Sequence, residues 1–193
     1  IKSSKGWNYT ESIIVHVSDS EGKAMIEGSV DLSNMRILSR IAKIPKEGTP
    51  QLLIFYRDKK EVFVNIDGSW VKVGEHEWHI EDTILYRIIE AMYKIGEFST
   101  TTIQENGTEY LVISAETSKD KRLDEIYLEL YNIASPCKET PQYTHVKITL
   151  KVMYEQDIPD TLSISFFSGN KLIMEMNYKV WSFDQEVKIS PPT

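Results

Sequence analysis

The sequence predicts an α+β fold in which one large antiparallel sheet carries a lid of helices. An alternating, strand-like pattern runs through the first 73 residues. Helical stripes of apolar residues then appear twice, separated by a hairpin, and the alternation returns after residue 145. The connections between strands are short, which favours antiparallel neighbours. This order of patterns indicates one sheet with two amphipathic helices lying across it.

Alternation predicts the first three strands. Glu11 is in phase with Ile13, Val15 and Val17, which is the period of a half-buried strand. We expect a turn at residues 20–22 and a second, tighter turn at residues 33–34. The second and third strands are predicted from Ala24, Ile26, Gly28 and Val30 on one face, and from the run Met35 to Ile44.

The next strands differ because residues 51–56 and 61–66 are apolar on both faces. Such strands are usually covered on both sides, so we expect layers above and below them. Asp67-Gly68 then predicts a two-residue hairpin turn, because a type I′ turn needs positive φ at both positions. A sixth strand begins at about Trp70.

The period changes to that of a helix at residue 84. Asp82 is placed to cap this helix and Gly96 to end it. A hairpin over residues 97–104 and 109–115 follows, turned at Asn106-Gly107. A second helix is predicted over about residues 119–133. The apolar stripes are Ile84, Leu85, Ile88, Ile89, Met92 and Ile95 on the first helix, and Leu123, Ile126, Tyr127, Leu130 and Tyr131 on the second.

Strand alternation fills the last third of the chain. Val146 to Tyr154 and Leu162 to Phe166 each alternate apolar with polar residues. Gly169-Asn170 predicts a hairpin turn, and Leu172 to Val180 forms the strand after it. The pattern stops at residues 187–192, which end in two prolines.

Length and charge bound the classes of function. A chain of 193 residues predicts one domain spanning 1–193 with a sizeable core. The net charge of −7 would repel a phosphate backbone, so we expect no nucleic-acid partner. No stretch is long and apolar enough to span a bilayer. The chain begins at Ile1, so we expect that an upstream segment has been removed, either a signal peptide or a part trimmed for expression.

No cluster of residues predicts catalysis. The chain lacks a Gly-X-Ser-X-Gly elbow, a glycine-rich phosphate loop and a Cys-X-X-Cys pair. The one cysteine, Cys137, is interpreted as a spectator thiol, because no Cys-His-Asn signature surrounds it. We therefore predict no enzymatic activity and no cofactor. A pocket holding carboxylates or histidines with strongly perturbed pKa values would revive the enzyme hypothesis.

One acidic stretch gathers metal-ligand residue types. His76 and His79 lie within Glu75 to Asp82, and two imidazoles with a carboxylate are ligands that a metal uses. Their spacing differs from His-Glu-X-X-His, which puts both rings on one helical face. A polar connection into a helix N-terminus explains the same residues. We therefore predict no metal site here.

The methionines favour a ligand cavity under the helices. Met153, Met174 and Met176 fall in the terminal strands, and Met92 lies on the apolar face of the first helix. Methionine is flexible and polarizable, so it suits a cavity that adapts to an acyl chain. The alternative is that these residues fill a solid core, which is the commoner role of an apolar stripe.

Two segments carry a family resemblance. Asn65 to Val73 reads Asn-Ile-Asp-Gly-Ser-Trp-Val-Lys-Val at a hairpin, and the closing segment from Met176 to Pro192 runs from aromatic residues into Ile-Ser-Pro-Pro. With the order of elements, they resemble the LolA/LppX/LprG-like lipoprotein carrier superfamily. The resemblance implies a curved antiparallel open half-barrel whose concave face is covered by two helices. It also implies a hydrophobic cavity that holds lipids or lipoprotein acyl chains outside the cytoplasm.

The leading hypothesis is therefore a binding module in the cell envelope or at the cell surface. Its partners would be a lipid or other hydrophobic small molecule, and a membrane surface reached through an anchor that this chain does not contain. The alternative is an envelope interaction or sensor domain on the same scaffold, with a solid interior and a functional edge or surface groove. The predicted cavity residues are Ile84, Ile88, Met92, Ile95, Leu123, Tyr127, Met174 and Met176.

Overall fold

The computed structural model describes residues 4–17, 20–44, 49–135 and 139–192. Its main element is an 11-stranded sheet in the order β6-β5-β4-β3-β2-β1-β11-β10-β9-β8-β7. Every neighbouring pair is antiparallel. The strands are β1 (Gly6–Val17), β2 (Ser20–Asp31), β3 (Arg36–Ile44), β4 (Gln51–Arg57), β5 (Glu61–Ile66), β6 (Ser69–Glu75), β7 (Ser99–Glu105), β8 (Thr108–Ser118), β9 (His145–Met153), β10 (Ile158–Ser168) and β11 (Lys171–Phe183).

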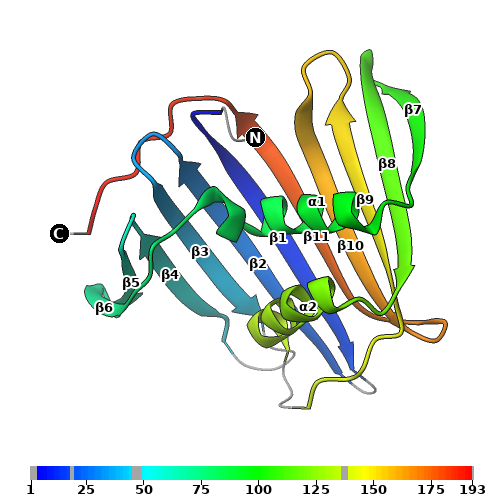
Figure 1. The fold of residues 1–193 in the computed structure, drawn as a ribbon. Coiled ribbons are helices and arrows are strands. Elements are labelled where there is room, and N and C mark those ends of the chain that lie inside the picture. Colours follow the sequence, from blue (N-terminus) through cyan, green and yellow to red (C-terminus); the bar gives the residue numbers. More distant parts are fainter. Residues whose placement is uncertain (1–3, 18–19, 45–48, 136–138, 193) are drawn as a thin grey trace.

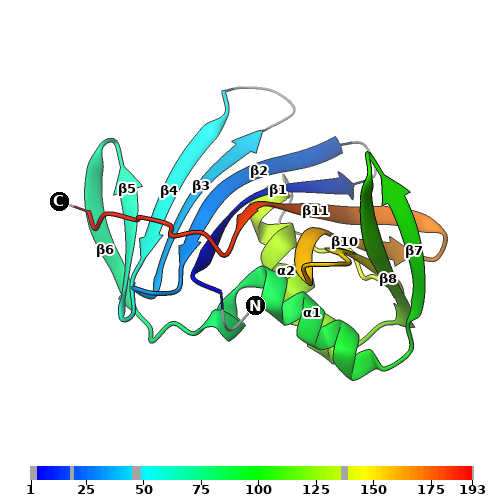
Figure 2. The same cartoon turned by 90° about the horizontal axis from the view of Figure 1, so that it is seen from above.

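The sheet is open and strongly curved, and both helices cross its concave face (Figures 1 and 2). They are α1 (Ile84–Ile95), preceded by the short 3₁₀ helix η1 (Ile80–Asp82), and α2 (Lys121–Ala134). The α1 segment carries the chain from edge strand β6 to the opposite edge strand β7, whereas α2 packs against β1, β2 and β3. The predicted open half-barrel with two covering helices is thus confirmed.

The first and last strands are neighbours at the middle of the sheet. β1 pairs with β11 over most of its length, from Trp7 opposite Phe183 to Val15 opposite Met174. One meander, β1 to β6, lies on one side of this seam, and β7 to β11 lie on the other. Local patterns predicted the strands and their hairpins. They carry no information about this pairing, because the two strands are far apart in the sequence.

Turn chemistry fixes the hairpins as the sequence predicted. Asp67 and Gly68 have φ values of 50° and 89°, and Asn106 and Gly107 have 51° and 80°. Both residues of each turn are therefore in the left-handed region that a type I′ turn requires. One expected turn is wrong: Glu21 and Gly22 lie within β2, where they pair with His16 and Val15 of β1. The β1–β2 hairpin therefore includes Glu21 and Gly22 as paired strand residues, where the local composition indicated a turn.

The residue that caps helix α1 lies one position later than expected. Thr83 is its N-cap, and the Thr83 Oγ1 accepts a hydrogen bond from the backbone N–H of Tyr86 at 3.4 Å. Asp82 instead closes η1, where its carboxylate accepts a hydrogen bond from the backbone N–H of His79 at 3.0 Å. Gly96 ends α1 with φ 77°, as predicted. None of the described helices is long and apolar enough to cross a membrane.

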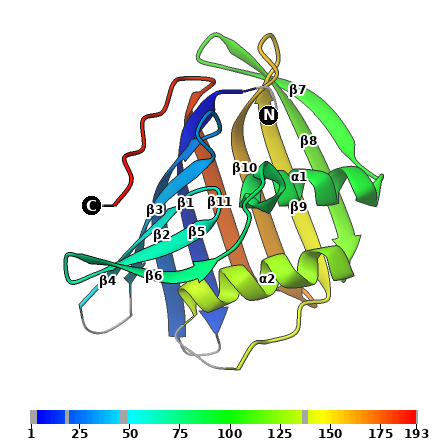
Figure 3. The same ribbon diagram turned by 60° about the vertical axis from the view of Figure 1, so that its left-hand side comes forward.

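The segment after β11 lies on the side of the sheet opposite to the helices (Figure 3). β11 ends at Phe183 because Asp184 takes a positive φ of 55°. Val187 and Ile189 then pack into a small second core, and the Arg36 guanidinium donates a hydrogen bond to the Ile189 carbonyl at 3.0 Å. The sheet residues in this core are Leu38, Tyr56, Phe63 and Trp70.

This segment covers only part of the two strands that we expected to be covered on both sides. Tyr56 of β4 is buried by it, but Leu52 is 62% exposed and Leu53 is 40% exposed. The helices do not reach the outer strands either, so Ile66, Val71 and Val73 are also exposed. Apolar faces therefore remain open at the β4–β6 end of the sheet, in contrast to the expectation of complete cover.

Candidate ligand cavity between the sheet and the helices

A cavity of about 320 Å³ lies between the concave face of β1 to β5 and the two helices. Its roof comes from the start of α1 and the C-terminal half of α2. The volume falls at the lower end of the range for small-molecule sites. The apolar lining is Ile26, Val30, Ile37, Ile41, Phe55, Val62, Ile84, Leu130 and Ile133, and the polar or aromatic lining is Tyr9, Glu11, Ser39, Arg57, Asp82, Thr83, Glu129 and Tyr178.

The strand register lays out the floor as rows that run across the sheet. In the first row, Glu11 lies opposite Ile26, which lies opposite Ile41. The second row runs from Tyr9 through Gly28 and Ser39 to Phe55. The third row contains Val30, Ile37 and Arg57. Because side chains alternate between faces, these in-register residues all point toward the helices.

Tyr9 forms the aromatic centre of the floor. Its ring stacks on that of Tyr178 with centroids 4.7 Å apart and an interplanar angle of 14°. The Tyr9 hydroxyl and the Ser39 hydroxyl share a hydrogen bond of 3.0 Å. The Tyr178 hydroxyl accepts a hydrogen bond from the Trp7 indole N–H at 2.9 Å. Burial raises the pKa of both tyrosines, so both hydroxyls stay neutral.

Glu11 is the acidic side chain of this largely apolar floor among the residues described. It is only 4% exposed, and the structure gives its carboxyl no hydrogen bond or ion pair with any residue that it describes. Burial raises the pKa of Glu11 to about 8, and the nearby Glu129 carboxylate of α2 adds to the shift. Glu11 is therefore protonated at neutral pH. A buried carboxyl in this state has hydrogen-bonding capacity that the protein does not use.

Of the residues predicted to line a cavity, Ile84 does so. Ile88, Met92, Leu123, Tyr127, Met174 and Met176 are buried together in the main core beneath the helices, and Ile95 packs against that core. The structure thus brings the predicted set together, but beside the cavity rather than around it. Contact of these seven residues with a ligand stays a prediction.

The aromatic surroundings of Tyr127 explain its place in the core. Its ring packs against those of Tyr143 and Phe166, with centroids 5.0 and 4.9 Å away. The Tyr127 hydroxyl donates to the Pro141 carbonyl at 2.5 Å, and the Tyr143 hydroxyl donates to the Asp124 carboxylate at 2.6 Å. These contacts fasten the chain after α2 to the helix. Cys137 belongs to this connection but lies outside the described residues.

Sequence reasoning missed most of the cavity wall, including Glu11 and Phe55. One signal was present, because Glu11 is in phase with the buried Ile13 and Val15 of β1. An acidic residue in the apolar phase of a strand indicates either a partner or a functional site. The remaining wall depends on which strands meet across the sheet and where the helices stop, and neither follows from local patterns.

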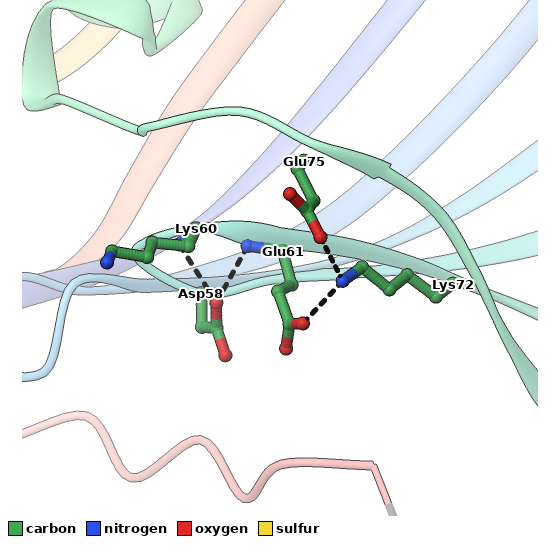
Figure 4. Close-up of polar contacts among 5 residues, drawn as sticks. All are labelled: Asp58, Lys60, Glu61, Lys72 and Glu75. Carbon is green, nitrogen blue, oxygen red and sulfur yellow. Dashed lines mark hydrogen bonds and ion pairs between the residues drawn. The ribbon is translucent and has the colours of Figure 1, made fainter.

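A second, polar hollow is lined by Asn34, Arg36, Asp58, Lys59, Lys60, Glu61 and Glu75, around the connection between β4 and β5. Figure 4 shows its ion pairs: the Lys72 ammonium contacts the carboxylates of Glu61 at 2.6 Å and Glu75 at 2.5 Å. The Asp58 carboxylate accepts hydrogen bonds from the backbone N–H groups of Lys60 and Glu61. Such mutually paired surface charges are typical of a solvated network. No three His, Cys, Asp or Glu side chains in the described chain are grouped to hold a metal ion.

Comparison with known proteins identifies the fold but not a sequence family. No family model matches the sequence, and no curated protein matches it. Among solved structures, LprF from Mycobacterium bovis matches with a TM-score of 0.57 and 12% identity, covering 99% of this chain and 90% of LprF. The Mycobacterium tuberculosis lipoprotein LppX matches with a TM-score of 0.55 and 10% identity, covering 98% of this chain and 91% of LppX.

At these identities the likeness concerns the fold, and it extends over nearly the whole chain. LppX is one of the proteins after which the group that the hairpin and closing segments resemble is named. The chain therefore has the fold of LprF and the lipoprotein LppX, and the resemblance read from the sequence is confirmed at the level of the fold.

Proposed function

We propose that the protein binds a lipid or another hydrophobic small molecule in the cavity between the sheet and the helices. The observation that carries this proposal is the 320 Å³ space itself, which has nine aliphatic or phenyl side chains in its wall. Moving an acyl chain from water into such a space contributes about 0.8 kcal/mol for each buried CH₂ group. The shared fold with lipoprotein LppX supports the same interpretation.

We further propose that the protein acts outside the cytoplasm, at the cell envelope, and is held at a membrane. The support is the fold shared with a lipoprotein. Fractionation of cells that express the natural gene product tests this. Recovery in the membrane fraction, with release by a protease added to intact cells, is the expected result, whereas recovery in the cytosol would reject it.

The cavity wall does not favour an enzyme. Glu11 has a strongly raised pKa, which is one mark of a catalytic acid or base. Catalysis also needs a reacting partner within reach. No histidine or cysteine appears among the described residues of the wall, and the Ser39 hydroxyl is already bonded to Tyr9. A binding role accounts for the same carboxyl without further groups.

The test is to identify what the protein carries when it is purified gently. Native mass spectrometry and organic extraction should find a co-purifying hydrophobic molecule. Ile41→Trp places a large ring in the cavity from its floor, and we expect it to reduce ligand uptake at least tenfold. Leu52→Trp makes the same kind of change at an exposed position of β4 outside the cavity wall, and it should leave uptake unchanged. Equal uptake by both variants would contradict the proposal.

A second candidate is suggested by the exposed apolar residues at the β4–β6 end of the sheet. Leu53, Ile66, Val71 and Val73 are each at least 40% exposed. Exposed apolar patches often mark contacts with another protein or a membrane. Under this hypothesis the protein is an interaction domain. A protein that carries no hydrophobic molecule, and whose Val73→Glu variant loses crosslinks to a partner seen with wild type, would favour it.

A further inference from the structure

Two acidic side chains are buried in the part of the chain that the structure describes, and they differ in one respect. Asp31 is 2% exposed, and its carboxylate accepts hydrogen bonds from the backbone and side-chain N–H groups of Asn34 at 3.0 and 2.8 Å. Glu11 is 4% exposed and has no such partner among the described residues. Burying a carboxyl without a partner is costly. Because the unpartnered Glu11 carboxyl lines a cavity, we infer that its partner is a bound molecule and not another group of the protein.

The groups around Glu11 make this end of the cavity acidic. On its two sides along the sheet, Glu11 lies opposite Ile26 of β2 and Tyr178 of β11. From above, Glu129 of α2 lines the same cavity and repels the Glu11 carboxylate. Tyr9 on the same strand has a neutral hydroxyl engaged with Ser39. None of these neighbours of Glu11 carries a positive charge.

Neither Arg57 of the cavity wall nor Arg87 of α1 forms an ion pair with Glu11. Arg87 of α1 forms ion pairs with Glu129 and Glu125 of α2, outside the cavity wall. Arg57 lines the cavity from β4, which is three strands away from β1. Arg57 also belongs to the third row of the floor, whereas Glu11 belongs to the first. At about 4.8 Å between strands, the lateral separation alone is roughly 14 Å. Asp82, a further charged wall residue, is acidic. Nothing cationic in the described wall therefore reaches Glu11.

We propose that Glu11 is the specificity determinant of the cavity, and that the ligand is an amphiphilic amine. Its ammonium group pairs with the Glu11 carboxylate, and its apolar chain lies along the wall formed by Ile26, Ile41 and the neighbouring apolar residues. This inference rests on the proposed function, because it assigns a ligand class to the same cavity.

An amine fits this end better than the other common head groups. A fatty-acid carboxylate would be repelled by the Glu129 carboxylate and would gain no charge partner from Glu11. A hydroxyl can bond to the protonated carboxyl, but this neutral bond is weaker than a bond to a charged group. An ammonium offers three donors, and once Glu11 has released its proton its carboxylate is an acceptor without a partner among the described residues. Pairing also gives the buried Glu11 carboxyl a partner, which it lacks among the described residues.

Binding of an amine has a proton balance that can be measured. A long-chain amine enters as an ammonium ion at neutral pH, and Glu11 begins as a neutral carboxyl. The ion pair forms when Glu11 releases its proton to solvent, so one proton leaves for each amine bound. Affinity should therefore rise about tenfold per pH unit from pH 6 toward pH 8 and then level off, because burial raises the pKa of Glu11 to about 8.

The experiment compares dodecylamine, dodecanol and dodecanoate, all with the same chain length. Each is titrated into the delipidated protein by calorimetry, below its critical micelle concentration, in two buffers with different ionisation enthalpies. We expect dodecylamine to bind at least about tenfold more tightly than dodecanol at pH 7.5, with release of a proton. Dodecanoate should bind most weakly.

Two variants separate the role of Glu11 from a general effect of replacing glutamate with glutamine. Glu11→Gln should bring amine and alcohol affinities to within about twofold and remove the proton release. Its binding of dodecanol reports whether the cavity is intact. Glu125→Gln is the same substitution at a site outside the cavity, because the Glu125 side chain is 89% exposed on α2 and does not line the cavity. This control should keep the preference for the amine.

The outcomes distinguish this inference from the proposed function. If dodecanol binds and the amine has no advantage, or keeps its advantage in Glu11→Gln, the assignment of Glu11 is wrong while the hydrophobic cavity stands. A preference for dodecanoate would overturn the inference in the same way. If none of the three ligands binds, the proposed function itself fails and the inference fails with it.

Discussion

The ring of Tyr9 lies directly over the backbone of Gly28, its opposite residue on β2. A methyl group at Gly28 would lie 2.2 Å from Cζ and 2.4 Å from the hydroxyl oxygen of Tyr9. The glycine is therefore required by close approach rather than by its φ angle. It allows the ring to lie flat on the sheet, where it stacks on Tyr178 and bonds to Ser39.

Gly28→Ala should therefore displace the Tyr9 ring and destabilise the protein by about 1–3 kcal/mol, because the added atom overpacks a filled site. Urea denaturation measures the change in the free energy of unfolding. Gly74→Ala on β6 is the matched control, since a methyl group there meets nothing within 4 Å. Equal stability of the two variants would show that the ring moves aside without cost.

Glu11 should give the protein an unusual dependence of stability on pH. The pKa of Glu11 is 4.5 in an unfolded chain and is raised to about 8 by burial and by Glu129. Between these values the folded protein keeps a proton that the unfolded chain releases. The contribution of Glu11 is thus favourable below pH 4.5 and is lost as the pH rises to about 8.

Glu11→Gln removes this titration. The variant should match wild type near pH 5 and exceed its free energy of unfolding by on the order of 2–4 kcal/mol at pH 9. Denaturation curves at several pH values measure the difference, which cancels the effects of all other titrating groups. A difference that stays constant from pH 5 to pH 9 would mean that Glu11 titrates normally.

Met92 and Ile84 lie on the same helix but have different surroundings. Met92 is 4% exposed within the main core, whereas Ile84 lines the cavity. Met92→Ala should cost about 2–5 kcal/mol of stability through the void it leaves, with ligand binding unchanged. Ile84→Ala should cost less stability and should alter binding. Thermal denaturation and ligand titration of both variants provide the measurements, and a reversed pattern would place the binding surface under Met92.

The Asp67-Gly68 turn should depend on its glycine. Gly68 has φ 89°, where a β-branched residue is strained. Gly68→Val should destabilise by roughly 1 kcal/mol or more, whereas Gly68→Asn should be milder because asparagine tolerates the left-handed region. Melting temperatures of the two variants check this. If valine and asparagine behave alike, the turn has adopted another type.

The features that local sequence predicted are those with local causes. Asn106-Gly107 and Asp67-Gly68 specify their turns because few residue pairs adopt positive φ at both positions. Gly96 ends α1 because glycine readily adopts the single positive φ found there. The cap of α1 was predicted one residue early, at Asp82, because Asp82 and Thr83 are both good caps and only the η1 turn decides between them.

The features that could not be predicted depend on contacts between distant segments. The pairing of β1 with β11 places Tyr178 beside Glu11, and no local pattern links these residues. The methionines and helix stripes were correctly recognised as apolar. An apolar stripe has the same sequence pattern whether it packs in a core or lines a cavity. The position of the cavity depends on the curvature of the sheet and on where α2 ends, and neither can be predicted from local sequence.

The seam between β1 and β11 bears on how this chain acquires its structure. The hydrogen bond from Trp7 to Tyr178 joins residues 171 positions apart, so the two meanders become one sheet only after almost the whole chain is present. Contacts of such long range slow folding. Glu11 comes from one meander and Tyr178 from the other, and the cavity contains both. A molecule bound there would contact both meanders and would stabilise the pairing of the two parts of the chain that meet last.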